Sequence, residues 1–146
     1  MRIAIGSDDI GFPVKSSLTS ALESEGHVVL DLGSFSADPV DYPDYARAVG
    51  QAVLRGFADA GILLCGSGVG ASIAANKVRN VRAAFCPDGL TARLSREQED
   101  ANVLCLAAGA GSPDTFVGIA KAWVGARFVV GSLMHAVWPR SPSSRS

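Results

Sequence analysis

The sequence contains few charged residues and no surplus of either sign. Of its 146 residues, 18 % are charged, and the formal net charge is −1. Disordered chains are rich in charge and poor in apolar side chains, whereas this chain is 48 % hydrophobic, so disorder throughout is excluded. Without a basic surplus, the sequence offers no general electrostatic attraction for nucleic acid or an anionic membrane surface. We expect neither partner.

Long apolar runs and cysteine patterns are missing as well. No run approaches the ~20 residues that cross a bilayer. The chain has three cysteines, an odd number, and each lies beside an apolar run, which argues against a disulfide scaffold and favours the cytoplasm. Neither CxxC nor HExxH occurs, so no metal site is predicted. A chain of this length is about the size of one ordinary domain.

Short apolar runs alternate with longer helical patterns along the chain. Strands are predicted at residues 2–7, 27–32, 60–65, 81–85 and 103–107. Helices are predicted at 13–26, from 41 onward, at 71–77, at 90–98 and from 113 onward. Strands that are apolar throughout are typical of parallel sheets buried on both faces. The pattern therefore predicts a three-layer α/β fold with about five parallel strands, followed by a loose Ser/Pro-rich tail at 138–146.

Candidate chemistry follows three of the predicted strands, because ligands of open parallel sheets bind outside the carboxyl ends of the strands. Asp8 and Asp9 follow the first strand, Cys65 ends the third, and Cys86 follows the fourth. A cysteine in such a position is often only a buried thiol. Cys65 differs because glycines at alternate positions and a helix start come after it. Backbone N–H groups and the positive helix end are predicted to favour its thiolate and lower its pKa.

The glycine loop after Cys65, Gly66-Ser67-Gly68-Val69-Gly70, has the outline of an anion cradle. It lacks the Lys-Ser or Lys-Thr of a nucleotide P-loop, but it fits G-x-G-x-x-A, so a dinucleotide site stays open as an alternative. A thiolate beside such a cradle suits acyl transfer with a histidine base, or proton abstraction next to a carbonyl. His27 and His135 have no evident place beside Cys65, which favours proton transfer.

Several segments resemble one family of sugar-phosphate isomerases. The segments are Ile5-Gly6-Ser7-Asp8, Gly11-Phe12, Lys15, Val40-Asp41-Tyr42-Pro43-Asp44, 61–70, Ser72-Ile73-Ala74-Ala75-Asn76-Lys77, Arg93-Leu94-Ser95-Arg96-Glu97 and Asp100-Ala101-Asn102-Val103-Leu104. They are similar, in order, to ribose-5-phosphate isomerase B and galactose-6-phosphate isomerase, the RpiB/LacA/LacB family. The resemblance extends from residue 1 to about residue 130, and we assign 1–137 to one such domain.

The resemblance implies a Rossmann-like α/β/α sandwich that forms a homodimer, sometimes a homotetramer, with active sites shared between subunits. It also implies cofactor-free aldose–ketose isomerisation through an enediolate. Cys65 would be the base that moves the proton, and Ser67 would assist it. The amides of Gly66, Ser67, Gly68, Val69 and Gly70 would hold the enediolate, while Asp8 and Tyr42 would bind sugar hydroxyls or help to open the ring.

The chain departs from the family at the positions associated with phosphate binding and ring opening. Asp9 replaces a histidine, Gln98-Glu99 replaces a His-Asn pair, and Gly109 stands where an arginine is expected. Residues 132–136 replace an Arg-His-x-x-Arg pattern. New carboxylates would repel a dianionic phosphate, so the sequence favours an unphosphorylated or unusual sugar, with Asp9, Gln98 and Glu99 among the substrate-binding residues. The alternative is a non-catalytic sugar-binding or regulatory descendant.

Overall fold

The computed structural model describes residues 1–34 and 42–130, which form ten alternating strands and helices. In chain order they are β1 (Arg2–Ser7), α1 (Phe12–Ser24), β2 (Val28–Asp31), α2 (Tyr42–Leu54), β3 (Ala60–Cys65), α3 (Val69–Asn76), β4 (Ala83–Phe85), α4 (Gly89–Glu97), β5 (Val103–Ala107) and α5 (Pro113–Val124). The predicted tail at 138–146 lies outside the described residues. No helix in 1–34 or 42–130 is long and apolar enough to cross a membrane.

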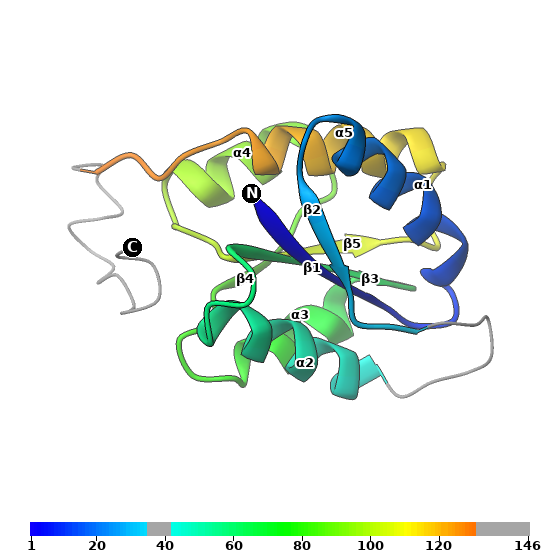
Figure 1. Ribbon diagram of the computed structural model, residues 1–146, viewed down its shortest axis with the longest axis horizontal. Coiled ribbons are helices and arrows are strands. Elements are labelled where there is room, and N and C mark those ends of the chain that lie inside the picture. The colour runs from blue at the N-terminus through cyan, green and yellow to red at the C-terminus, as the bar shows by residue number, and fades with distance from the viewer. Residues whose placement is uncertain (35–41, 131–146) are drawn as a thin grey trace.

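The strands form one parallel sheet in the order β2-β1-β3-β5-β4. Helices α1, α4 and α5 cover one face, and α2 and α3 cover the other (Figure 1). Each face has its own apolar core, with Trp123 of α5 fully buried on the first and Val49 of α2 fully buried on the second. This arrangement confirms the predicted three-layer α/β/α sandwich of about five parallel strands.

Two predicted boundaries move for identifiable reasons. Strand β4 begins at Ala83, later than predicted, because the Asn102 side chain accepts a hydrogen bond from the Arg82 backbone N–H at 2.7 Å. Helix α3 begins at Val69, two residues earlier than predicted. Gly68, whose φ of 80° suits glycine, turns the chain so that the helix starts inside the glycine loop.

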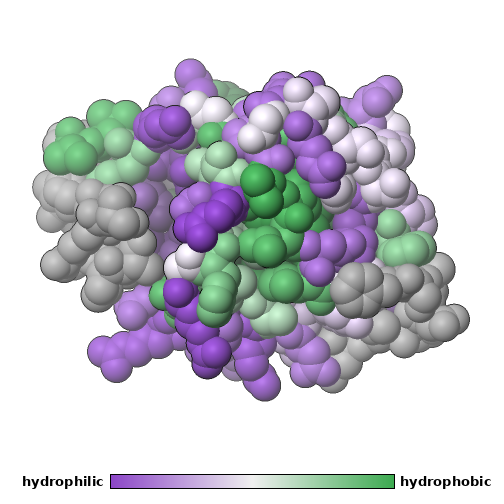
Figure 2. All heavy atoms as spheres, in the orientation of Figure 1, coloured by the Kyte–Doolittle hydropathy of each residue, from purple (hydrophilic) through white to green (hydrophobic). Residues whose placement is uncertain are grey.

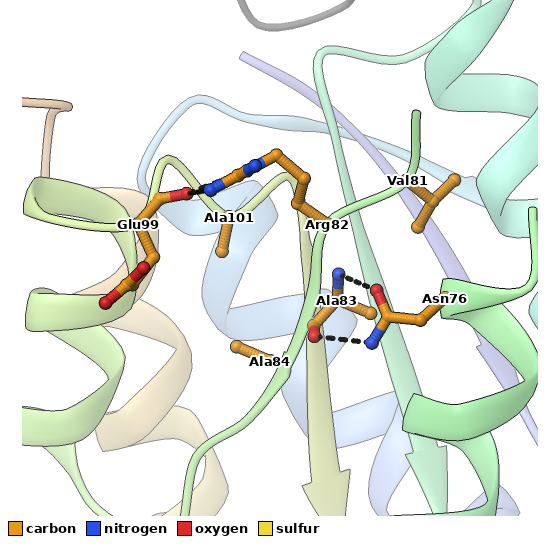
Figure 3. Close-up of a pocket in the computed structure, with 7 residues that line it drawn as sticks. All are labelled: Asn76, Val81, Arg82, Ala83, Ala84, Glu99 and Ala101. Atoms are coloured by element: carbon orange, nitrogen blue, oxygen red, sulfur yellow. Dashed lines mark hydrogen bonds between the residues drawn. The ribbon is translucent and has the colours of Figure 1, made fainter. Parts of the chain in front are cut away.

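The sheet has two edge strands, β2 and β4, with different surroundings. Figure 2 shows an apolar patch at the centre of the visible face, over β2. At the other edge, the Asn76 side chain pairs with the backbone of Ala83 in β4 (Figure 3). Its amide donates to the Ala83 carbonyl at 2.9 Å, and its oxygen accepts from the Ala83 N–H at 2.8 Å. This side chain therefore occupies hydrogen-bonding groups on the outer side of β4.

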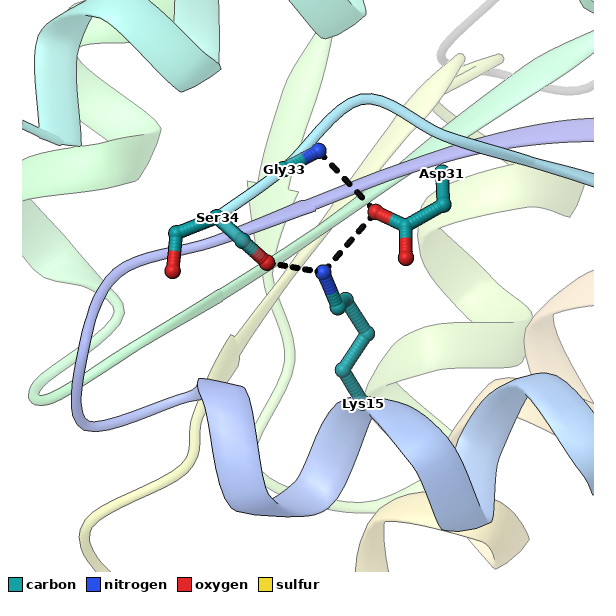
Figure 4. Close-up of polar contacts among 4 residues, drawn as sticks. All are labelled: Lys15, Asp31, Gly33 and Ser34. Atoms are coloured by element: carbon teal, nitrogen blue, oxygen red, sulfur yellow. Dashed lines mark hydrogen bonds and ion pairs between the residues drawn. The ribbon is translucent and has the colours of Figure 1, made fainter. Parts of the chain in front are cut away.

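A buried lysine links α1 to the end of β2 (Figure 4). Lys15 Nζ lies 2.8 Å from Asp31 Oδ1 and also donates to the carbonyl of Ser34. The same carboxylate oxygen accepts from the Gly33 N–H at 2.9 Å. The ammonium group also lies 5.4 Å from the centre of the Phe12 ring. Lys15 thereby fixes the turn after β2 against α1.

Candidate active site

Cys65 is the last residue of β3, at the carboxyl edge of the sheet, and only 5 % of it is exposed. The glycine loop follows it directly and leads into α3. The backbone N–H groups of Ala71 and Gly68 are close enough to its sulfur to lower the pKa of the thiol. The predicted juxtaposition of the thiol, the loop and the helix start is therefore present.

The predicted effect on the acidity of Cys65 is wrong. Burial raises the pKa of the thiol, and the N–H groups of Ala71 and Gly68 offset this only in part. The negative charge of Asp8 raises it further. The sequence pattern revealed the donors but not the loss of water around the sulfur, which is the larger effect.

Asp8 ties two loops together beneath the candidate site. Its Oδ1 accepts from the Gly11 N–H at 2.7 Å, and its Oδ2 accepts from the Gly66 N–H at 3.1 Å. The residue is 9 % exposed. Asp8 thus holds the start of the glycine loop, and the structure brings it together with Cys65 as predicted.

The rest of the loop is more open. Ser67 is exposed, and its Oγ accepts from the Val69 N–H at 3.4 Å. Val69 is 52 % exposed. Gly66 and Gly70 are partly exposed, as is Asp9, which follows Asp8 at the same edge. A ligand can therefore reach the loop backbone, and the Ser67 hydroxyl lies beside it.

Phe85 is a further residue of the site that sequence reasoning missed. A Cβ atom added to Gly68 would lie 2.6 Å from Phe85 Cδ2 and 2.7 Å from Cε2, so the ring packs directly against the loop backbone. Phe85 ends β4, and β5 separates that strand from β3. Nothing in the linear sequence signals this contact, since it depends on the order of strands in the sheet.

Gln98 and Glu99 lie at the opposite end of the sheet from Cys65. Helix α4 runs back from the carboxyl edge, and both residues follow its last turn. Arg82, which precedes β4, donates from Nε to the Glu99 carbonyl at 2.8 Å. Glu99 also lines a pocket of about 400 Å³ with Asn76 and Arg82 (Figure 3). Within one chain, these two predicted substrate-binding residues are apart from Cys65.

The remaining predicted residues lie either outside the described part of the structure or far from Cys65. Tyr42 begins α2, and its side chain lies outside the described part of the structure. His135 also lies outside it. His27 precedes β2, at the amino edge, and so is remote from Cys65 as expected. Among the described residues, no group of three His, Cys, Asp or Glu side chains could hold a metal ion.

Known proteins share both this sequence and this fold. A model of the ribose/galactose isomerase family matches residues 3–137. The chain belongs to the ribose/galactose isomerase family. It is 42 % identical to ribose-5-phosphate isomerase B of Escherichia coli (strain K12) over 130 residues, which cover 89 % of this chain and 87 % of the relative.

Other members of the ribose/galactose isomerase family carry different substrate names. The chain is 38 % identical over 135 residues to D-erythrulose-4-phosphate isomerase of Pectobacterium atrosepticum, covering 90 % of this chain and 87 % of that protein. The structure of Clostridium thermocellum ribose-5-phosphate isomerase B superposes with a TM-score of 0.89 at 42 % identity. That match covers 94 % of this chain and 91 % of the other. The predicted family is thus confirmed, as is the Rossmann-like fold that the resemblance implied.

Proposed function

We propose that this protein is an aldose–ketose isomerase in which Cys65 moves a proton between two adjacent carbons of a sugar. The observation that carries the proposal is the position of Cys65 at the end of β3, directly before the glycine loop and α3, where the N–H groups of Ala71 and Gly68 lower the pKa of its thiol. Membership of the ribose/galactose isomerase family supports this chemistry over acyl transfer or dinucleotide binding. Relatives named as isomerases of different sugar phosphates leave the substrate open.

The reaction needs one base and one oxyanion site. The Cys65 thiolate removes the proton from the carbon next to the carbonyl, and the electron pair forms an enediolate. Asp8 accepts from the Gly66 N–H and the Ser67 hydroxyl accepts from the Val69 N–H, so the other amides between Gly66 and Gly70 stabilise the oxygen that gains negative charge. Cys65 then returns the proton to the neighbouring carbon, while the Ser67 hydroxyl assists proton movement between the two oxygens. The electron pair never leaves the substrate, so no redox cofactor is required. While the proton is on the Cys65 sulfur it can exchange with solvent.

The complete site requires a second copy of the chain. Gln98 and Glu99 lie at the other end of the sheet, so they can meet a substrate at Cys65 only on a partner subunit. Large apolar side chains that are more than half exposed surround the glycine loop and the nearby helices: Ile10, Val69, Ile73 and Leu90. Such a cluster fits a protein interface. We infer a homodimer, or a homotetramer built from it, with shared sites.

The phosphate preference of the relatives is proposed to be altered here. Asp9 adds a carboxylate at the edge where the substrate binds. A Cβ atom at Gly109 would lie 3.1 Å from the Gly66 carbonyl oxygen, so this position packs against the loop backbone and supplies no cation. An unphosphorylated or unusual sugar avoids the repulsion that a dianionic phosphate would meet at a carboxylate. Rapid turnover of ribose 5-phosphate would contradict this part of the proposal.

The decisive experiment is deuterium wash-in followed by NMR. The protein is incubated in heavy water with matched phosphorylated and free aldoses and ketoses. Exchange at the carbon beside the carbonyl is expected with the wild type and is expected to disappear with Cys65→Ala. Cys86→Ala is the control, since Cys86 is another buried thiol, 1 % exposed, that contacts Ser95 and not the glycine loop.

Two results would contradict the proposal. Undiminished exchange in Cys65→Ala would exclude Cys65 as the base. Binding of a sugar without any exchange, unchanged by Cys65→Ala in calorimetry, would instead establish the non-catalytic alternative.

A further inference from the structure

The outer side of β2 carries unpaired backbone groups. Val28 donates to the Met1 carbonyl at 3.0 Å and Leu32 donates to the Ile5 carbonyl at 2.9 Å, so alternate residues of β2 face β1. In a parallel ladder the N–H and C=O groups of one residue point to the same side. Val29 and Asp31 therefore direct their N–H and C=O groups away from the sheet. Within the described residues, β2 has β1 as its one neighbouring strand.

The surface around this edge is apolar. Val28 is 58 % exposed and Phe57, which lies beyond the end of α2, is 63 % exposed. A hollow of about 340 Å³ lies beside the strand and is lined by Leu30, Leu32, Ala52 and Phe57 among others. The apolar patch over β2 lies at the surface of the molecule (Figure 2). Exposed, flat and apolar edge strands are surfaces on which other strands pair.

We propose that a second copy of this chain pairs its β2 antiparallel to β2 across a two-fold axis at Val29. The two Val29 residues then exchange a pair of N–H···O hydrogen bonds. The Asp31 N–H of each copy donates to the His27 carbonyl of the other. Val28 of each copy lies opposite Leu30 of the other, next to the apolar hollow. This inference is independent of the proposed function, because β2 and the glycine loop are different surfaces.

The side chains select this axis over its neighbours. With the axis at Val29, His27 of one copy lies directly opposite Asp31 of the other, which places an imidazole beside a carboxylate. An axis at Asp31 would bring two carboxylates together, and an axis at Leu30 would place Asp31 against Val29. Like charges directly opposite one another destabilise a strand pair.

Asp31 has the capacity for this contact. Its Oδ1 accepts from Lys15 and Gly33, whereas its Oδ2 takes part in no hydrogen bond within the described residues. The Asp31 side chain is 40 % exposed, so its second oxygen is accessible. The same chain supplies both the imidazole and the carboxylate, and this self-complementarity indicates a second copy as the occupant.

Cysteine cross-linking tests both the surface and the register. Val29→Cys places its two thiols on the axis, at the Cα separation of about 5.5 Å that a disulfide accepts. Mild oxidation is expected to convert most Val29→Cys chains to covalent dimers on a non-reducing gel. Val28→Cys and Leu30→Cys, whose thiols face other residues, are expected to give at least fivefold less. The wild type, with its buried native cysteines, gives the background.

The particle mass gives a second measurement on the native chain. Val28→Lys adds a charge opposite Leu30 and is expected to halve the mass seen for the wild type in analytical ultracentrifugation. Cys65-dependent exchange is expected to persist, since the glycine loop is untouched. An unchanged mass overturns the proposal, as does a covalent dimer formed by Leu30→Cys in place of Val29→Cys. A failed Cys65→Ala test would overturn the proposed function alone.

Discussion

At the scale of single residues, the central feature is the thiol of Cys65, our proposed base, which is buried rather than acidified. Burial raises the pKa of Cys65, which makes the thiol reluctant to ionise but makes its thiolate a stronger base. A proton on carbon beside a carbonyl is weakly acidic, so base strength matters in its removal. The N–H groups of Ala71 and Gly68 limit the pKa rise, and their placement therefore affects the rate.

Phe85 controls that placement, because its ring packs against Gly68. Phe85→Leu is expected to slow Cys65-dependent exchange at least about tenfold, since displacing positioned groups by even an ångström is costly. The pH at which Cys65 reacts with iodoacetamide is expected to rise as the Gly68 N–H moves away. Phe116→Leu is the control, because Phe116 is 4 % exposed in the opposite core. Equal loss of activity in both variants would indicate general destabilisation.

The candidate site was predictable from the sequence only in part. Asp8, Cys65 and the glycine loop could be identified, because each follows an apolar strand and the loop has its own glycine pattern. Phe85 could not be identified, since its contact with Gly68 depends on where β4 lies in the sheet. The pKa direction of Cys65 was also inaccessible, because spacing shows hydrogen-bond donors but not the exclusion of water.

At the scale of elements, the contact between α1 and β2 depends on one buried ammonium group. Lys15 is 4 % exposed and has Asp31 and Ser34 as partners. Lys15→Met is expected to lower the free energy of unfolding by about 1–3 kcal/mol, a range that allows for the partly exposed carboxylate. Urea unfolding measures the change.

Lys121 provides a matched control for that substitution. Its ion pair with Glu25 has an N···O distance of 3.2 Å, and both side chains are 44 % exposed. Lys121→Met is expected to cost less than about 1 kcal/mol, because exposed ion pairs are weak. If both variants lost the same amount, burial of Lys15 would not be what makes its contacts stabilising.

Strand positions were more predictable than strand arrangement. The bounds of β1, β3 and β5 agree with the prediction, because these strands are mostly apolar and are followed by turn residues. β4 is shorter, since a side chain from the turn before β5 binds the backbone at Arg82. The strand order β2-β1-β3-β5-β4 could not be predicted, because the periodicity of apolar residues describes one segment at a time and not which strands are neighbours.

At the scale of the whole molecule, its buried thiols make stability depend on pH. Burial raises the pKa of Cys105, which is 0 % exposed, far above its ordinary value of 9.0. At a pH above the ordinary value of 9.0, the Cys105 thiol ionises in the unfolded chain but stays protonated in the folded one. The unfolded state then holds fewer protons, so the free energy of unfolding falls as pH rises, by about 1.4 kcal/mol per pH unit for this cysteine.

Denaturant unfolding between pH 8 and pH 10.5 measures this slope. Cys105→Ala is expected to have a shallower slope above pH 9, because one of the titrating thiols is gone. Comparison of slopes, not of absolute stabilities, removes the cost of the small cavity that the substitution creates. Identical slopes in the wild type and the variant would show that Cys105 does not control the pH dependence.

The Asn76 side chain on β4 has a consequence for how far the sheet can grow. A sheet with two open edges can add copies at both ends and extend into a fibre. Here the Asn76 side chain occupies backbone groups of β4, at one edge of the sheet. Pairing through β2 uses the other edge, so the two outer edges of the paired sheets are both β4 strands. Growth of the sheet through its edges therefore stops after two chains. The side chain of Asn76 would thus prevent a paired sheet from extending into a fibre.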